Sequence, residues 1–599
     1  MNINDNQSQS IIWTQIERKC LLLLQQRKNS KLSLLQIHAF MLRHSIESNL
    51  KLLAKFISTC SSIPFTGILH ARRLFDHSLH RTDNFICNTM LKAHVDNRQF
   101  KQCITLYQLL RFDLTGFIPD NYTFSSLAKA CGLSKGFWEG QEIHNHVLKL
   151  GFLSNLFAST SLVDMYSKFG SMNYAHKLFD EMPVRSQVSW TVLVDGYARN
   201  GDLITARNIF HQSPAKDCAS YNVMIDAYVK ILDMDSARYL FDEMPERNVV
   251  SWTSIIDGYC NQGDVNSARL LFDTMPNKNL YSWNAMIGGY SRNKQSREAL
   301  RLFDRLESCS WFEPDTVTIV SILPAVADLG ALDWGIRLHC FVTRKKLDRA
   351  TNVCTALIDM YAKCGEIEKA IRIFKEMPEK ELATWNALIN GLAINGKAKE
   401  ALEVFSNMKR NGFIPNEITL LGVLSACNHS GLVEEGKKWF NAFDEFNLKP
   451  GIEHYGCLIH LLGKSGCLEE AEKLIEEMPY DVNGVVLSSF LSACGFAKDV
   501  ERVERMKKKA IEMEPWNDGN YVMLRNLYAE ERKWNEVEEI KGLMKKKGAK
   551  KEIGFSVIEV EGRVLEFIAG DQMYQEEETM IFFILGNLFL HMTDYGSCT

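Results

Sequence analysis

The chain holds 15 histidines and 16 cysteines, the residue types that bind zinc and activate water in many hydrolytic enzymes. A zinc deaminase that acts on nucleobases needs H-x-E followed downstream by P-C-x-x-C. No histidine here is followed two residues later by glutamate, and no two cysteines are spaced C-x-x-C. The sequence also lacks P-loop and H-E-x-x-H motifs. We therefore expect no catalytic residue, no metal site and no cofactor.

Composition narrows the remaining classes of function. Lys and Arg number 69 against 73 Asp and Glu, so the protein would not hold nucleic acid chiefly by neutralising phosphates. Apolar residues make up 46% of the chain, which suffices for a large core. The spread of cysteines is typical of a reduced, intracellular protein. The apolar run at 580–592 is shorter than the roughly 20 residues that span a bilayer, so we expect a terminal packing helix and no membrane partner.

A repeat with a step of 31 residues runs through the middle of the chain. Three sets of residues keep this step: Phe179, Phe210, Phe241 and Phe272; Trp190, Tyr221, Trp252 and Trp283; and Ala175, Ala206, Ala237, Ala268 and Ala299. Units of 31 or 32 residues alternate with units of 34 to 37. The division gives 13 units: 50–83, 84–120, 121–155, 156–186, 187–217, 218–248, 249–279, 280–315, 316–350, 351–381, 382–416, 417–451 and 452–483.

Each unit is predicted to be a helix–turn–helix hairpin. In 249–279, residues Trp252, Ile255, Ile256 and Tyr259 fall on one helical face. Gly263 and Asp264 then supply a turn and a helix cap. Ala268, Leu271, Phe272 and Met275 form the inward face of a second helix, and Pro276 blocks its continuation. Stacked neighbours would bury both faces, so the recurring apolar positions are interpreted as structural.

The units resemble the plant pentatricopeptide repeat family, in the subgroup that mixes long and short repeats. The resemblance covers about 50–570 and is carried by SWNAMIGGY, ALIDMYAKCGEIEKA, FKEMPEK, LSACNHSGLVEEG and IEHYGCLIHLLGKSGCLEEAEKLIEEMP. It implies an all-α fold, a right-handed superhelix of helix–turn–helix repeats. The tetratricopeptide repeat, the nearest alternative, keeps a steady 34-residue period and lacks the SWN and MP phrases.

The segment after the last unit resembles the extension of organelle RNA-editing members, without their deaminase domain. It begins GVVLSSFLSACG and runs to KKEIGFSVIEVEGRVLEFIAGD. The family usually has Pro, Cys and Trp near the positions of Ile553, Phe555 and Val557, and its His-Pro phrase after Asp571 is replaced by QMYQ. We divide the chain into a leader and partial repeat at 1–49 that could include a short transit peptide, the repeats at 50–483, an E-type extension at 484–551 and a degenerate E+-like tail at 552–599.

The resemblance implies that two side chains per repeat, the fifth and the last, select one RNA base by hydrogen bonding to its pairing edge. Apolar side chains at the second position can pack on base faces. The predicted base-binding pairs are Asn88 with Asp120, Thr160 with Ser186, Thr191 with Asp217, Asn222 with Asn248, Thr253 with Asn279, Asn284 with Asp315, Thr355 with Glu381, and Asn386 with Asn416. A competing interpretation is that Asn and Thr merely begin helices.

Family preferences then imply a base for each pair. Asn with Asp favours U, Asn with Asn favours C or U, Thr with Asn favours A, and Thr with Asp favours G. The units 187–217, 218–248, 249–279 and 280–315 therefore predict the consecutive order G, pyrimidine, A, U, read from the 5′ side.

The leading hypothesis is a site-recognition factor for organellar C-to-U RNA editing that recruits a deaminase-bearing protein in trans, together with other proteins of an editing complex. The alternatives are a factor for splicing, stability or translation of a transcript, and a protein-binding helical scaffold. The short leader favours the mitochondrion over the chloroplast as the compartment.

Overall fold

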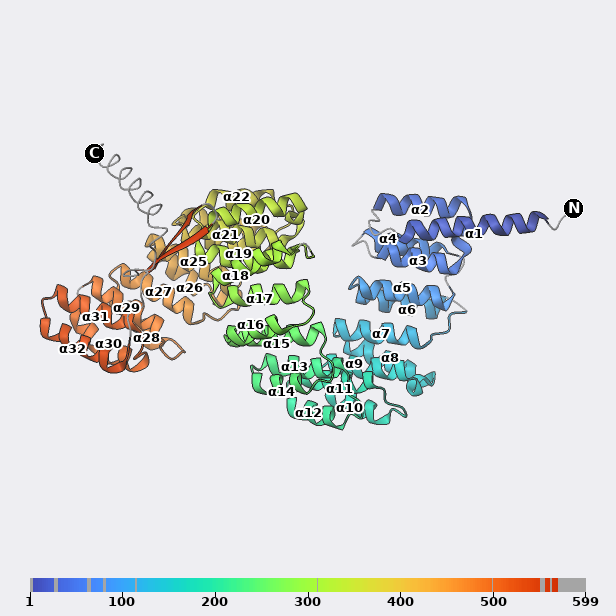
Figure 1. Ribbon diagram of the computed structural model, residues 1–599, viewed down its shortest axis with the longest axis horizontal. Coiled ribbons are helices and arrows are strands. Elements are labelled where there is room, and N and C mark those ends of the chain that lie inside the picture. Colours follow the sequence, from blue (N-terminus) through green and yellow to red (C-terminus); the bar gives the residue numbers. More distant parts are fainter. Residues whose placement is uncertain are drawn as a thin grey trace. The chain divides into compact units, whose positions relative to one another are not determined.

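The structure is a computed structural model that describes residues 4–25, 31–61, 66–78, 82–113, 116–309, 311–497, 499–549, 555–560 and 563–568. The chain forms two compact units, Met1–Gln262 and Gly263–Thr599, and helices dominate both (Figure 1).

The first unit contains α1 (Asn4–Gln25), α2 (Lys31–Arg43), η1 (Ile46–Ser48), α3 (Leu50–Ser61), α4 (Thr66–His77), α5 (Asn84–Asp96), α6 (Phe100–Asp113), α7 (Asn121–Ser134), α8 (Phe137–Lys149), η2 (Phe152–Ser154), α9 (Leu156–Lys168), α10 (Met172–Glu181), α11 (Gln187–Arg199), α12 (Leu203–Gln212), α13 (Cys218–Lys230), α14 (Met234–Glu243) and α15 (Val249–Gln262).

The second unit contains α16 (Val265–Thr274), α17 (Leu280–Arg292), α18 (Ser296–Ser308), α19 (Thr316–Leu329), α20 (Leu332–Lys345), η3 (Leu347–Arg349), α21 (Thr351–Lys363), α22 (Ile367–Glu376), α23 (Leu382–Ile394), α24 (Ala398–Arg410), α25 (Glu417–Ser430), α26 (Val433–Asn441), η4 (Asp444–Phe446), α27 (Ile452–Lys464), α28 (Leu468–Glu477), α29 (Gly484–Phe496), α30 (Val500–Met513), α31 (Asp518–Glu530), α32 (Trp534–Lys547), β1 (Phe555–Val560) and β2 (Arg563–Ile568).

Local sequence sets where the second helix of a short repeat begins and ends. The carboxylates of Asp202, Asp233 and Asp264 accept from the backbone N–H three residues later, at 3.0, 3.1 and 3.1 Å, and so cap α12, α14 and α16. Gly263 has φ of +93°, a conformation that favours glycine. A proline follows within two residues of each of these helices and stops it.

Within each unit, successive hairpins stack through a repeated seam. The first helix of one hairpin packs on the first helix of the next, as α9 does on α11 and α21 does on α23. The Phe272 ring lies 5.1 Å from the Trp283 ring at 79°, and the same edge-on contact joins Phe179 to Trp190 and Phe374 to Trp385. The predicted inward residues Ala268, Leu271, Phe272 and Met275 are buried. The all-α fold of stacked helix–turn–helix repeats is thereby confirmed.

The segment after residue 483 continues the stack. Helices α29 to α32 form two more hairpins, and their apolar residues share one core with the repeat at 452–483, from Leu458 and Leu462 through Phe490 to Tyr528 and Ile540. Strands β1 and β2 then pair antiparallel, with Phe555 opposite Ile568 and Val560 opposite Arg563. This β-hairpin was not part of the predicted all-α fold.

Among the described residues, no helix combines the length and apolarity needed to cross a bilayer. The predicted terminal packing helix at 580–592 lies outside the described residues.

Candidate functional site

The last residue of each predicted pair begins the first helix of the next hairpin. Asp217 shows the arrangement: its carboxylate accepts from the Ser220 N–H at 2.8 Å, and its own N–H donates to the Ser220 hydroxyl at 3.0 Å. The same N-cap bond to the third residue of the helix is made by Asp120, Ser186, Asn248, Asn279, Asp315 and Asn416. In seven of the eight pairs, the side chain of the last residue therefore caps a helix.

The fifth residue lies elsewhere, one turn into its helix. Asn88 is the fifth residue of α5, Asn222 of α13, Asn284 of α17 and Asn386 of α23. A side chain this far along a helix has no free backbone N–H to cap. The fifth residues therefore do not cap helices, whereas the last residues cap them and can take a second role as well.

All four asparagines at the fifth position donate to the last residue of their pair. The Nδ2 atom of Asn88 lies 2.9 and 3.0 Å from the two carboxylate oxygens of Asp120. The other three amide nitrogens contact one oxygen each: Asn222 with Asn248 at 3.2 Å, Asn284 with Asp315 at 3.2 Å and Asn386 with Asn416 at 3.1 Å. An amide nitrogen carries two hydrogens, so each asparagine keeps one N–H for a further acceptor.

The threonines behave differently. The hydroxyls of Thr191, Thr253 and Thr355 donate to the carbonyl four residues earlier, at 3.0, 2.9 and 2.9 Å, a usual habit of threonine within helices. Thr160 is half-buried in α9, and the Glu381 backbone N–H donates to the Thr384 hydroxyl at 3.4 Å. Direct hydrogen bonds between the fifth and last residues are thus a property of the asparagine pairs.

Large apolar side chains stand exposed at the second position of the repeats. Tyr281 is 72% exposed, Tyr122 68% and Phe157 66%. The set also includes Phe85, Val188, Val250, Val317 and Ile418. Each lies three residues before the fifth position, on the same side of its helix. Flat or branched apolar groups beside polar slots are suited to packing on the faces of planar rings.

Sequence reasoning missed one group of residues at these slots, the third residue of the following repeat. The Thr123 hydroxyl donates to the Asn88 amide oxygen at 2.7 Å, and the Thr419 hydroxyl to that of Asn386 at 2.7 Å. Thr384 contacts Thr355 in the same manner at 2.9 Å. The signal was the capping phrase at 120–123, 381–384 and 416–419, in which a polar residue precedes the threonine by three positions. This phrase reveals the cap and gives no hint of the contact across repeats.

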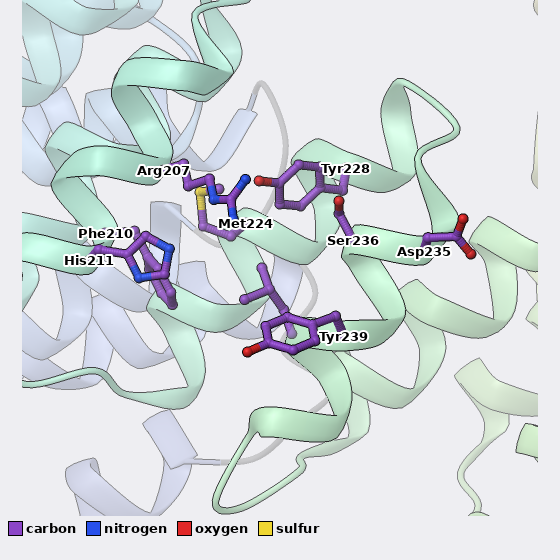
Figure 2. A pocket seen from close by; sticks show the side chains of 9 residues that line it. Arg207, Phe210, His211, Met224, Tyr228, Asp235, Ser236 and Tyr239 are labelled. Carbon is purple, nitrogen blue, oxygen red and sulfur yellow. The ribbon is translucent and has the colours of Figure 1, made fainter.

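A cavity of about 280 Å³ lies between neighbouring hairpins, apart from these slots (Figure 2). It is lined by α12, α13 and α14, and Arg207 and Tyr228 point toward one another across it (Figure 2). At the equivalent positions, His176 bonds Tyr197 at 2.7 Å and His339 bonds Tyr361 at 2.9 Å, and burial lowers the pKa of His339. The cavity therefore lies at a contact that recurs between successive hairpins, and we interpret it as structural.

Over the part of the chain that the structure describes, no three His, Cys, Asp or Glu side chains gather as a metal site would require. The described cysteines are all free thiols, and burial raises the pKa of several of them, that of Cys103 to about 12. A thiol with a raised pKa is a poor nucleophile.

Comparisons with known proteins match both parts of the chain. Models described as the pentatricopeptide repeat match residues 157–186, 188–218, 219–249, 281–310, 353–382 and 453–481, and related repeat models match 246–276 and 380–429. A model described as the E motif matches 496–559.

Relatives from Arabidopsis thaliana match 90% or more of this chain. One pentatricopeptide repeat-containing protein is 57% identical over 555 residues, which cover 92% of this chain and 99% of the relative. Another is 45% identical with 92% of both chains covered, and a third, named as chloroplastic, is 39% identical with 90% and 78% covered. The crystal structure of the pentatricopeptide repeat protein PPR10 in complex with an 18-nt psaJ RNA element matches 86% of this chain and 77% of its own, with 15% identity and a TM-score of 0.50.

Proposed function

The chain belongs to the pentatricopeptide repeat family, and from this premise we propose that it binds single-stranded RNA and reads one base with each repeat. The observation that carries the proposal is the row of polar pairs. The fifth and last residues recur at the same place in hairpin after hairpin, and asparagine amides there keep an unused N–H. The structurally similar PPR10 was crystallised with an RNA element, which supports the same use of the fold here.

The chemistry of the slots fits bases better than phosphates. The amides, hydroxyls and carboxylates of the pairs can donate to or accept from the pairing edge of a base. Neighbouring second-position side chains such as Tyr122, Phe157 and Tyr281 can stack on its face, a contact worth about 1–3 kcal/mol per base. The net charge of −4 leaves phosphate neutralisation a minor contribution.

We propose further that this RNA binding selects a cytidine for conversion to uridine in an organelle transcript, and that a deaminase-bearing protein supplies the chemistry in trans. The match to the E motif at 496–559 supports editing over splicing, stability or translation. The sequence carries no zinc-deaminase motif, so recruitment is the role assigned to this segment. We propose the mitochondrion as the compartment, with the chloroplast, named for one relative, as the alternative.

Binding should require unpaired RNA, because base pairing hides the edges that the pairs must reach. The protein would first be incubated with a pool of single-stranded RNAs randomised over the footprint, and the preferred sequence recovered. The same sequence is then presented alone and annealed to its complement. We expect tight binding of the single strand and little binding of the duplex; equal affinity for both would contradict base reading.

The region that follows the E-motif helices should be needed for editing and dispensable for RNA binding. Cutting the chain after residue 483 would remove Phe490 and the rest of α29 to α32, and so expose Leu458 and Leu462 of the shared core. Cutting after Ala549 leaves α29 to α32 in place. We expect the chain ending at Ala549 to bind the recovered RNA with unchanged affinity. In a plant that lacks the protein, organelle cDNA sequencing should find one unedited site that the full chain restores and the shortened chain does not. Restoration by the shortened chain would show that the residues after 549 are not needed for editing, and would confine the recruiting role to 496–549.

A further inference from the structure

The four asparagine repeats fall into two states that differ in the amide oxygen. In the first state the oxygen accepts a hydroxyl from the following repeat, Thr123 to Asn88 and Thr419 to Asn386, both at 2.7 Å. In the second state, at Asn222 and Asn284, the oxygen is buried and has no hydrogen-bond partner. We call Asn88 and Asn386 the held asparagines, and Asn222 and Asn284 the unheld asparagines.

The two states differ in which oxygen receives the hydroxyl proton of the third residue of the following repeat. In the unheld repeats, Thr318 donates to the Asp315 carboxylate at 2.9 Å and Ser251 to the Asn248 carbonyl at 2.8 Å. A hydroxyl has one proton to give. Thr419 lies within reach of both the Asn386 oxygen at 2.7 Å and the Asn416 oxygen at 2.8 Å. The latter already accepts from the Thr419 N–H and the Asn386 amide, so the proton goes to Asn386.

Holding the oxygen changes what the amide can offer a base. A held amide has its oxygen bonded to a hydroxyl and one N–H bonded to the last residue, so it presents a donor only. An unheld amide makes one hydrogen bond, through its N–H to the last residue. Its buried, unpaired oxygen costs about 1–3 kcal/mol of free energy, and rotation of the amide toward a donor would remove this cost. It can therefore present either its N–H or its oxygen.

We propose that Thr123 and Thr419 are positioning residues that make Asn88 and Asn386 donor-only readers and thereby sharpen their discrimination between pyrimidines. On the pairing edge, uracil has a carbonyl, an acceptor, where cytosine has an amino group, a donor. An amide that can only donate therefore bonds to uracil at this position and not to cytosine. The inference rests on the proposed RNA binding and adds a third residue to the two that select each base.

The identity of the last residue does not explain the two states. Asn88 and Asn284 are both paired with aspartate, Asp120 and Asp315, yet one is held and the other is not. Asn386 and Asn222 are both paired with asparagine and differ in the same way. Each kind of pair thus provides one held and one unheld repeat, which separates the effect of the hydroxyl from that of the last residue.

The test is Thr419→Val in the full chain, which replaces a fully buried hydroxyl with a methyl group of similar size. Base preferences are recovered from the randomised single-stranded RNA pool, and affinities are then measured for the preferred RNA with U and with C at each pyrimidine position. We expect the ratio of the two affinities to fall toward one at a single position, by roughly 2- to 10-fold, the value of one neutral hydrogen bond. Thr419→Ser, which keeps the hydroxyl, should keep the ratio of the unmodified chain.

Thr318→Val is the matched control. The Thr318 hydroxyl accepts from the Asp315 N–H at 3.1 Å, as Thr419 does from the Asn416 N–H at 3.2 Å, so both variants lose the same cap contact. Only Thr419 touches the amide of a fifth residue. An unchanged ratio in Thr419→Val, or an equal fall at the corresponding position in Thr318→Val, would overturn the inference. Failure of the unmodified chain to select any sequence from the pool would instead overturn the proposed function.

Discussion

Asp217→Asn should turn the base preferred by the repeat at 187–217 from G toward A. The fifth residue of this repeat is Thr191, and the change converts a Thr–Asp pair into a Thr–Asn pair. A carboxylate can only accept hydrogen bonds, whereas an amide also donates, so the new pair complements a different base edge. By analogy with mismatches at protein–DNA sites, the preference should shift by about 1–3 kcal/mol, or roughly 5- to 150-fold.

The substitution is structurally mild, which makes its outcome interpretable. Asn279, Asn248 and Asn416 already cap equivalent helices through the same bond that Asp217 makes, and the two residue types cap equally well. Asp202→Asn, the same chemical change at the N-cap of the second helix of this repeat, is the control and should leave the base preference unchanged. The measurement is the affinity for the pool-derived RNA with each of the four bases at the facing position. Indifference to the base, before and after the change, would show that this repeat does not read RNA.

Phe272→Ala should cause the largest loss of stability among single substitutions in its hairpin, about 3–5 kcal/mol. The side chain is 0% exposed, its ring contacts Trp283 edge-on, and the Lys278 ammonium lies 5.3 Å from its centre. Truncation leaves a cavity between two hairpins, where neighbouring repeats provide most of each other's stability.

Leu270→Ala provides the comparison within the same helix. Leu270 is 66% exposed, and its truncation should change the free energy of unfolding by no more than about 0.5 kcal/mol. The midpoint of urea unfolding, followed by helical circular dichroism, separates the two variants. Equal midpoints for them would contradict the assignment of the 31-residue phenylalanine step to the core.

Elements whose cause is local could be predicted from the sequence, and those that depend on a second hairpin could not. Pro276 and Asp264 mark the ends of α16 because capping and chain stiffness act over a few residues. The period placed Asn386 and Asn416 at corresponding slots, and the structure brings them into contact. Their role in reading a base remains a prediction.

The hydroxyl contacts could not be predicted because Thr318 and Thr419 occupy the same place in similar capping phrases. Only the packing of one hairpin on the next brings the Thr419 hydroxyl within 2.7 Å of the Asn386 amide oxygen. The β-hairpin of β1 and β2, by contrast, could have been predicted from its local sequence. The runs at 555–560 and 563–568 are rich in branched and aromatic residues around the pair Glu561 and Gly562, which is typical of two short strands and a turn. The helical family resemblance outweighed this local pattern.

The shared core between the repeat at 452–483 and helices α29 to α32 has an energetic consequence for the end of the array. Terminal repeats of a stacked protein open more readily than internal ones, because each has a neighbour on one side only. Among the described helices, α27 and α28 are internal to the stack, and α31 and α32 stand last in it. A protein that grips α31 and α32 therefore raises the free energy of opening in α27 and α28 by linkage, and stiffens the last repeat without touching it.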